Sequence, residues 1–593
     1  MRAVPAPWAQ ASGLGERLLG GALVLLLTGA SFILAAPAHG RDHLDFAALM
    51  QGADIGELDY SAFAPGPQAA PASNHFEGRL RLDGKPRTRT RTRLADFVSD
   101  AELAQARTLP ADFSVTFVQD ADVLIPVQRG PMPSTHGWWE FIVEPGRVWD
   151  EPGDQGYTRA AIPFSLQERN ANCTHQGVLL LLFRNDGTTS HAALRVAGET
   201  CRYLKLDMWG TLRTHYDAGP VAAAAGVVRA YHEEVAQRLP VRPIAQLARD
   251  YPGVMAENLA IGDPKAHSVH GLVVDGVNYV SSCTSRAGDY PYCEVMDLPS
   301  FSTAKSIFAG IALMRLEALA PGMARRPLRA FLPSVCAPEK WSQVTFLNAL
   351  DMASGNFDSD SFESDENAAG TNGLFLPPDH ASKIDYACNT YPHRAAPGER
   401  WVYHTSDTYV LGTALSTYLR TLPGREHEDL YADLVVREVF APLGLSQVAR
   451  TTRRTYDAVR QPFTGWGLTY HHDDIARLAA FLSSGEGKIG NRALLDRGLL
   501  AAALQRQETD RGLETAGLRG FRYQHGFWAR DLQDLLTCSH PLWVPFMSGY
   551  GGISVVMFPN GVVYYNFSDD GETASFDWSG PARVSNRIRP ICS

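Results

Sequence analysis

The arrangement of hydrophobic residues changes near residue 240, and this change limits what the chain can fold into. From about residue 76 to 218 the hydrophobic residues form short β-prone runs such as Gly177–Phe183, and Gly, Pro, Asp and Asn residues separate these runs. Short strands between turn residues are typical of an all-β sandwich or barrel-like domain. A segment with helical spacing follows, and strands then alternate with helices. The sequence therefore predicts a β-rich N-terminal domain over residues 76–238 and an α+β domain over residues 239–593.

The N-terminus has the pattern of an export signal. Basic residues precede an uncharged stretch, Leu18–Ala36, and Ala36-Pro37-Ala38 then offers a cleavage site between small residues. This pattern predicts a secretory signal peptide over residues 1–38 and hence a secreted or periplasmic protein. Because the stretch is just long enough to cross a bilayer, an uncleaved anchor is the alternative, and no other membrane contact is expected. Residues 39–75 are rich in Ala, Pro and Gly and are expected to form a linker.

Eight cysteines lie beyond the predicted signal, and an even number in an exported chain favours disulfide bonds. The simplest arrangement joins sequence neighbours, in the pairs Cys173–Cys201, Cys283–Cys293, Cys336–Cys388 and Cys538–Cys592. No Cys-x-x-Cys pair occurs, so a structural zinc site of that type is not expected. The net charge of −10 argues against a nucleic-acid partner, because such proteins usually carry a basic surplus.

Residues 87–93 alternate strictly between Arg and Thr. In a strand this pattern places four Arg side chains on one face and three Thr side chains on the other. The pattern favours a solvated edge strand whose charges discourage aggregation, and a stripe that binds polyanions is the alternative.

Ser302 and Lys305 form the pattern Ser-x-x-Lys before a segment whose apolar residues have helical spacing. Residues three apart on a helix lie on one side, so the Lys305 amine is expected beside the Ser302 hydroxyl. If burial lowers the pKa of Lys305, the neutral amine can accept the hydroxyl proton and make Ser302 a nucleophile. The alternative is a helix-capping serine followed by a solvated lysine.

Further short motifs follow Ser302 in a fixed order, and each is weak alone. They are Val344–Gly355, Pro397–Gly412, Ala441–Leu445, Gly465–Leu468 and Ser548–Gly552. In this order and spacing they resemble the serine β-lactamase-related family, in particular its branch with class C β-lactamases, family VIII esterases and nylon-oligomer hydrolases. The resemblance covers about residues 255–590 and not the β-rich domain. It implies a β-lactamase/penicillin-binding-protein-like fold, in which helices flank an antiparallel sheet.

The resemblance also implies catalytic roles for three residues. Ser302 matches the family's nucleophile, Lys305 its partner base and Tyr403 the tyrosine that shares proton transfer with the lysine. An adjacent ammonium group stabilises a phenolate, so Tyr403 is expected to act first as a base and then as an acid. The implied reaction transfers an acyl group from a small-molecule ester or amide to Ser302 and then hydrolyses the acyl-enzyme. No metal or cofactor is implied.

The chain departs from the family pattern at the second motif. Thr405 occupies the place of the usual Asn that follows Tyr403. A competing register reads Ser406–Thr408 as the Ser-Asp-Asn motif of class A relatives. The flanking Pro-Gly and Leu-Gly pairs favour the register with Tyr403.

The third motif departs as well, because the chain reads Met547-Ser548-Gly549 where relatives carry Lys-Thr-Gly or His-x-Gly. Met547 cannot supply the cation that helps to bind a substrate carboxylate, so β-lactam hydrolysis and cell-wall carboxypeptidase action are not favoured. Ser548 and Gly549 still permit the strand that flanks the site, and the N–H groups of Ser302 and Tyr550 are expected to form the oxyanion hole. The expected substrate-binding residues are Thr405, Ser548, Gly549 and Tyr550.

Other patterns are interpreted as structural. His471–Asp474 has metal-ligand residue types but is expected to begin a helix with Asp at its cap. The acidic residues within 358–366 lack the spacing of a calcium loop and predict a solvated loop that rims the cleft. Asn172-Cys-Thr and Asn566-Phe-Ser are formal glycosylation acceptors.

The sequence thus predicts an exported, esterase-like serine hydrolase. A D-amino-acid peptidase or penicillin-binding protein of the same fold is the first alternative. The second is a catalytically silent binding protein that retains the fold. Thr405 and Met547 keep this last interpretation open, whereas the intact Ser302, Lys305 and Tyr403 weigh against it.

Overall fold

The computed structural model describes residues 44–111, 113–198, 200–571 and 575–592. The predicted signal peptide over residues 1–38 lies outside the described residues. Within the described ranges, no helix is both long and apolar enough to span a bilayer.

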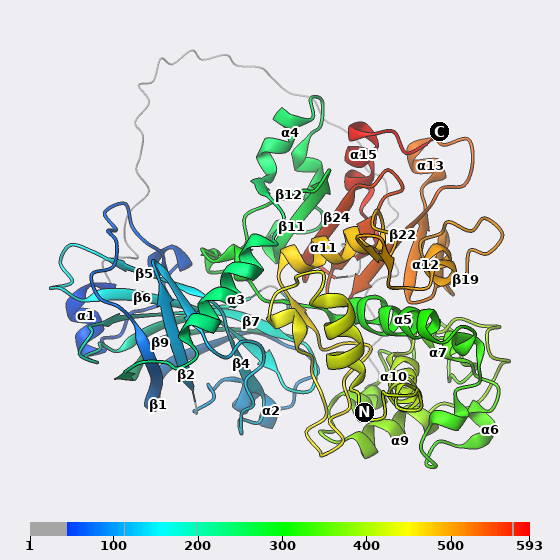
Figure 1. The fold of residues 1–593 in the computed structure, drawn as a ribbon, viewed down its shortest axis with the longest axis horizontal. Coiled ribbons are helices and arrows are strands. Elements are labelled where there is room, and N and C mark those ends of the chain that lie inside the picture. The colour runs from blue at the N-terminus through cyan, green and yellow to red at the C-terminus, as the bar shows by residue number, and fades with distance from the viewer. Residues whose placement is uncertain (1–43, 112, 199, 572–574, 593) are drawn as a thin grey trace, which may run out of the picture. The chain divides into compact units, whose positions relative to one another are not determined.

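The β-rich part of the chain is a sheet that closes on itself (Figure 1). Its strands in chain order are β1 (Glu77–Ala95), β2 (Ser114–Asp120), β3 (Val123–Pro126), β4 (Trp139–Val143), β5 (Gly146–Asp150), β6 (Thr158–Glu168), β7 (Thr174–Phe183), β8 (Ala192–Ala197) and β9 (Leu204–Ala218). Neighbouring strands are antiparallel, and β6 pairs with β7 as well as with β5, which completes the ring. β4 pairs with β6 beyond the end of β5. The predicted all-β domain is thus confirmed, in its closed form.

Strand β7 is buried on both of its faces. Leu179 and Leu181 belong to the core inside the closed sheet, whereas Val178, Leu180 and Leu182 join the core of the α+β part. Successive side chains of a strand point to opposite faces, so a strand between two cores is apolar at every position. This burial explains the uninterrupted hydrophobic run that the sequence shows here.

Residues 44–75 do not form the expected linker. They contain helix α1 (Phe46–Gln51) and the 3₁₀ turn η2 (Tyr60–Phe63), and the side chains of Leu49 and Tyr60 are fully buried. The Tyr60 hydroxyl donates a hydrogen bond to the Gln176 carbonyl oxygen at 2.7 Å. A few well-spaced apolar residues among Ala, Pro and Gly are therefore enough to pack this segment against the closed sheet.

The Arg/Thr alternation lies in β1, with its Arg side chains exposed and its Thr side chains half-buried, as predicted. In the described register, residues 87–95 pair with β9 alone, so this half of β1 is an edge. Arg89 is paired with Asp54, and Arg91 lies 2.9 Å from Glu57. These ion pairs favour the interpretation as a charged edge strand.

The α+β part is built on a second sheet. Its strands, in spatial order, are β10 (Val241–Pro243), β12 (Val277–Val280), β11 (His267–Val274), β24 (Val563–Ser568), β23 (Ile553–Met557), β22 (Trp543–Gly549), β21 (Phe527–Asp531), β20 (Phe521–Gln524) and β19 (Leu513–Glu514). The pairings are antiparallel except at the edge, where β10 is parallel to β12. α5 (Ile311–Leu319) and α11 (His472–Leu482) pack on one face, and α15 (Ser579–Ile588) packs on the other. The predicted antiparallel sheet flanked by helices is confirmed.

Other helices complete the fold (Figure 1). α3 (Ala224–Ala236) is the helix expected between the two parts. The largest buried helix is α10 (Thr405–Leu419), which packs against α7 (Phe346–Leu350) and α9 (His380–Asn389). The remainder are α2 (Asp100–Ala106), α4 (Leu247–Asp250), α6 (Pro338–Trp341), α8 (Asn372–Phe375), α12 (Arg497–Ala503), α13 (Gln533–Leu536) and the π-helical segments Lys305–Gly310 and Leu430–Phe440.

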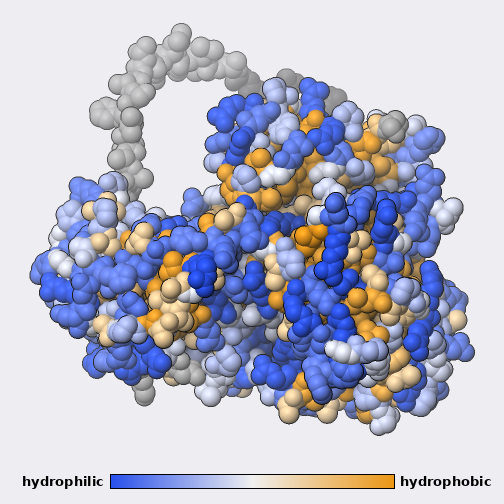
Figure 2. Space-filling view, in the orientation of Figure 1, coloured by the Kyte–Doolittle hydropathy of each residue, from blue (hydrophilic) through white to orange (hydrophobic). Residues whose placement is uncertain are grey.

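All eight cysteines are among the described residues, and they form the four sequence-neighbour disulfides that were predicted. The contacts within residues 40–593 make one compact unit, because the two parts share the core around β7. The domain boundary at 238/239 stays a prediction. Figure 2 shows hydrophilic residues over most of the visible face, in keeping with the gathering of apolar side chains in these cores.

Candidate active site

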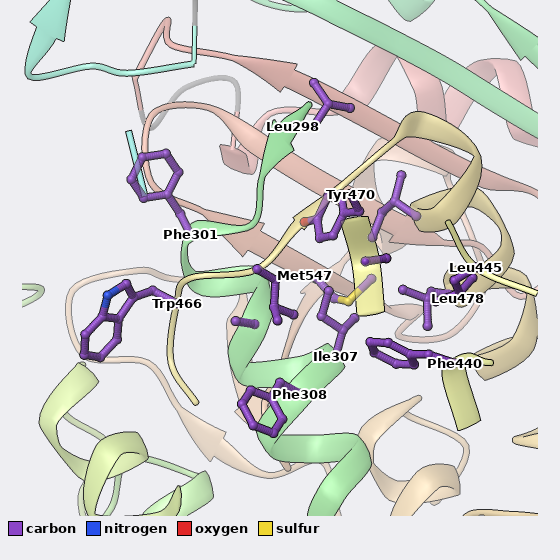
Figure 3. Close-up of a cluster of buried hydrophobic side chains, with 14 of the residues drawn as sticks. Leu298, Phe301, Ile307, Phe308, Phe440, Leu445, Trp466, Tyr470, Leu478 and Met547 are labelled. Carbon is purple, nitrogen blue, oxygen red and sulfur yellow. The ribbon is translucent and has the colours of Figure 1, made fainter. Parts of the chain in front are cut away.

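Ser302 lies in a short helical turn that is held by buried apolar neighbours. The 3₁₀ turn η7 (Phe301–Thr303) leads into the π-helical turn Lys305–Gly310 and then into α5. Ile307 and Phe308 are fully buried and anchor this segment in the core (Figure 3). Ser302 itself is half-buried. The hydroxyl is thus presented on a fixed backbone at the edge of the core.

Lys305 connects Ser302 to two residues from elsewhere in the chain. Its Nζ donates hydrogen bonds to Ser302 Oγ at 2.9 Å and to Thr405 Oγ1 at 2.8 Å. The Thr405 hydroxyl in turn donates to a carboxylate oxygen of Glu366, and the Thr405 N–H donates to the other oxygen at 2.9 Å. These contacts fix the amine of Lys305 beside the Ser302 hydroxyl.

The environment of Lys305 favours the neutral amine. The side chain is 1% exposed, and burial lowers its pKa to about 8, although the charge of Glu366 acts in the opposite direction. Removal of an ammonium group from water disfavours its charged form. A substantial fraction of Lys305 is then neutral near pH 8 and able to accept a proton from Ser302.

Tyr403 joins the same group of side chains. Lys305 Nζ lies 4.8 Å from the centre of the Tyr403 ring, which stacks on Trp528. Burial, followed by the charges of Glu366 and Glu363, raises the pKa of Tyr403 well above its usual value, and a hydrogen bond with Ser302 only partly opposes this. The expected phenolate base is therefore disfavoured. The geometry suits Lys305 as the base and Tyr403 as a proton donor.

Thr405 is not placed for the substrate contact that the sequence predicted. It is 1% exposed at the start of α10, and its hydroxyl lies between Lys305 and Glu366. The competing register is also disfavoured, because Ser406–Thr408 is buried in the first turn of the helix. The register with Tyr403 is the one that reaches Ser302, since the Tyr403 hydroxyl is hydrogen-bonded with Ser302 and its ring lies beside Lys305.

Strand β22 runs beside the Ser302 turn. A Cβ atom on Gly549 would lie 2.9 Å from the Ser300 carbonyl oxygen, so the approach depends on glycine. Ser548 is half-buried, and Tyr550, just after the strand, is 42% exposed with its ring 5.8 Å from that of Phe301. The structure thus brings the predicted oxyanion segments together, at the turn of Ser302 and the end of β22.

Met547 lies away from this surface. It is fully buried in the core cluster with Ile307 and Tyr470 (Figure 3). Arg522, a cation in β20, donates to the Gly512 carbonyl oxygen and to Glu514, both at 3.0 Å. Neither residue supplies a positive charge for a substrate carboxylate.

The acidic loop of residues 358–366 contributes to the site, which the sequence interpretation missed. Asp365 is 4% exposed, accepts hydrogen bonds from two backbone N–H groups and lies 2.9 Å from His404 Nε2. Glu366 accepts from Thr405 as described above. The expected solvated loop is thus partly wrong. The loop has no periodic pattern, so the sequence carried no signal of which acid would turn inward.

Both formal glycosylation acceptors are structural residues. Asn172 and Asn566 are fully buried. Asn566 Nδ2 donates to the Gly552 carbonyl oxygen at 2.9 Å, and Asn172 Oδ1 accepts from the Phe301 N–H at 2.8 Å. Their amides are therefore occupied in the core and closed to modification of the folded chain.

A buried cluster of Glu144, Asp297 and His471 has ligand-type atoms that face one another. Among the described residues, these facing atoms have no hydrogen-bond partner. The N-cap residue of α11 is His471 and not the Asp that the sequence predicted. The His471 ring accepts a hydrogen bond from a backbone N–H of the first turn. In a neutral imidazole the other nitrogen then carries the hydrogen, so the atom that faces the carboxylates is a donor. This donor set does not fit a metal ion.

No family model matches this chain, and no curated protein matches it. The solved hydrolase EstCE1, which has promiscuous acyltransferase activity, is 16% identical over 61% of this chain and 98% of its own, with a TM-score of 0.41. A β-lactamase/D-alanine carboxypeptidase from Pseudomonas syringae is 11% identical over 61% of this chain and 98% of its own, with a TM-score of 0.37.

A third solved structure is described as a 6-aminohexanoate-dimer hydrolase from Bacillus anthracis. It is 17% identical over 59% of this chain and 86% of its own, with a TM-score of 0.41. The chain resembles hydrolases of the β-lactamase fold. Because these TM-scores are below 0.5 and the identities are low, what this chain can do rests on its own contacts.

Proposed function

We propose that the protein is an exported serine hydrolase that cleaves an ester or amide through an acyl-enzyme on Ser302. One observation carries the proposal: the buried Lys305 amine, with its pKa lowered to about 8, donates to Ser302 Oγ at 2.9 Å. A nucleophile within hydrogen-bond reach of a base is the arrangement that covalent catalysis needs. The chemistry belongs to the α+β domain, residues 239–593.

The first half of the reaction forms the acyl-enzyme. Neutral Lys305 accepts the Ser302 proton while Oγ attacks the substrate carbonyl carbon. The N–H groups of Ser302 and Tyr550 hold the developing oxyanion. As the tetrahedral intermediate collapses, the proton passes from the Lys305 ammonium, with Tyr403 as donor, to the leaving alcohol or amine.

The second half releases the product. Water enters in place of the leaving group, gives its proton to the regenerated Lys305 amine, and attacks the acyl carbon. The Ser302–acyl bond then breaks, and the proton returns to Ser302 Oγ. This cycle balances without a metal, cofactor or redox partner.

The first prediction concerns the nucleophile. A fluorophosphonate probe should add one adduct to the mature protein, on Ser302, because Lys305 makes this hydroxyl reactive. Intact-mass detection and peptide mapping measure the adduct, and Ser302→Ala is the control. Absence of labelling in the wild type would favour the catalytically silent alternative, and labelling that persists in Ser302→Ala would reject the assignment.

The second prediction concerns substrate choice, on which the esterase-like and peptidase-like alternatives differ. Met547 lies in the core and Arg522 is bound to Glu514, so neither residue gives a substrate carboxylate the charge-assisted hydrogen bond that a cation at the third motif provides, worth about 1.5–3 kcal/mol. We expect kcat/KM for a short neutral ester to exceed that for nitrocefin. A larger value for nitrocefin on the same preparation would favour the penicillin-recognising alternative.

A further inference from the structure

The hairpin between β6 and β7 of the closed sheet reaches the turn that carries Ser302. Asn172, at the end of this hairpin, is fully buried. Its Oδ1 accepts hydrogen bonds from the Phe301 N–H at 2.8 Å, the Ser300 hydroxyl at 3.0 Å and the Gly467 N–H at 2.9 Å. Its Nδ2 donates to the Leu468 carbonyl oxygen at 3.2 Å. One amide from the β-rich domain thus binds two segments of the α+β domain.

The backbone that Asn172 holds is strained. Phe301, directly before Ser302, has a φ of 40°, in the left-handed region that residues with a side chain seldom adopt. Such conformations persist only where the surroundings fix them. The Phe301 N–H donates to Asn172. On the other side, the Ser300 N–H donates to the Leu468 carbonyl oxygen, and the Leu468 N–H donates to the Ser300 hydroxyl oxygen, both at 3.0 Å.

We propose that Asn172 is a positioning residue for Ser302, so that the β-rich domain completes the active site. The proposal rests on the proposed role of Ser302 as nucleophile. Asn172 does not touch the reacting atoms. It holds the Ser300–Phe301 backbone in the conformation that aims Ser302 Oγ at the Lys305 amine and the Ser302 N–H toward the oxyanion position.

The docking of the hairpin does not depend on Asn172 alone. Asn170 Nδ2 donates to the Leu376 carbonyl oxygen at 2.9 Å, and Trp466 Nε1 donates to the Asn170 carbonyl oxygen at 3.1 Å. The Cys173–Cys201 disulfide also restrains the base of the hairpin. A variant of Asn172 should therefore keep the two domains together while the Ser302 turn loses its hold.

The test measures the second-order rate of fluorophosphonate labelling in the full-length protein, together with kcat and KM for a neutral ester. Asn172→Ala should label about 10²-fold more slowly, with the loss mainly in kcat, because small misplacement of a nucleophile has large effects on rate. Asn170→Ala is the matched control: it removes a docking hydrogen bond of the same hairpin without touching the Ser302 turn, and should label at the wild-type rate. Equal labelling of folded Asn172→Ala and wild type would overturn the proposal.

Two further variants separate positioning from stability. Asn172→Asp keeps an acceptor for the three donors but loses the hydrogen bond from Nδ2 to the Leu468 carbonyl oxygen, so it should label at a rate between those of Asn172→Ala and the wild type. Ser300→Ala removes both hydrogen bonds of the Ser300 hydroxyl, the one that it donates to Asn172 and the one that it accepts from the Leu468 N–H, and should slow labelling about tenfold. If Asn172→Ala does not fold, the labelling rate of Ser300→Ala decides the question. A labelling rate of Ser300→Ala equal to that of the wild type would reject the positioning role of Asn172. A wild type that does not label rejects the proposed function itself, which is a different outcome.

Discussion

Lys305 carries its amine into the core, where it donates to the hydroxyl oxygens of Ser302 and Thr405. Burial and not a neighbouring cation lowers its pKa, and Glu366 limits the shift. The same burial raises the pKa of Tyr403. The pKa values of Lys305 and Tyr403 are therefore shifted in opposite directions. This difference suits Lys305 as the base and Tyr403 as the acid of one site.

The third prediction is the pH dependence of acylation. The folded-state pKa of Lys305 is depressed to about 8, so the neutral amine increases as the pH rises through that value. We expect kcat/KM for a neutral ester to rise about tenfold per pH unit below pH 8 and to level off above it. A pH–rate profile with a substrate that does not ionise measures this limb.

Lys305→Ala provides the control for that profile. It should lower kcat/KM by about 10²–10⁴-fold, the usual worth of a positioned base, and remove the limb near pH 8. An unchanged rate and profile in this variant would mean that Lys305 is structural and that another group accepts the Ser302 proton.

At the scale of elements, β7 is the strand that joins the two cores. Its odd-numbered leucines fill the closed sheet, and Val178, Leu180 and Leu182 pack against the α+β part. The β6–β7 hairpin, which carries Asn172, lies directly before β7 in the chain. The packing of the two cores and the proposed positioning of Ser302 thus depend on the same pair of strands, β6 and β7.

The fourth prediction follows from this packing. Leu180→Ala should lower the free energy of unfolding by about 2–5 kcal/mol, because it leaves a cavity between the two cores. Leu319, which is 37% exposed at the end of α5, offers a matched control, and Leu319→Ala should change stability by about 0.5 kcal/mol or less. Urea unfolding measures both. Equal effects of the two variants would contradict a shared core at β7.

At the scale of the whole molecule, disulfides stabilise both parts. Cys173–Cys201 lies in the β-rich part, and Cys283–Cys293, Cys336–Cys388 and Cys538–Cys592 lie in the α+β part. Such bonds form and persist in oxidising compartments, so they favour an extracellular or periplasmic environment. This agrees with the export signal proposed for residues 1–38.

The fifth prediction is the thiol content of the mature protein. Titration of the denatured, unreduced protein should find no free thiol, because the described cysteines are all paired. The same protein after reduction should release all eight, which serves as the control. Several free thiols before reduction would reject the disulfide framework and count against export.

Much of the site was predictable because it depends on local spacing. Ser302 and Lys305 are three residues apart, and any helical turn brings such residues together. The strands of the β-rich part follow from short apolar runs and turn residues, and the disulfides follow from sequence neighbours. These features need no knowledge of distant contacts.

The tertiary structure alone decided the rest. Glu366 and Asn172 come from loops without periodic patterns, and packing determined that one would bind Thr405 and the other the Ser302 turn. Packing also turned Met547 into the core and gave residues 44–75 partners on the closed sheet. The physical reason is that a side chain's neighbours along the chain are set by backbone periodicity. Its neighbours across the fold are set by how separate elements bury their apolar surfaces.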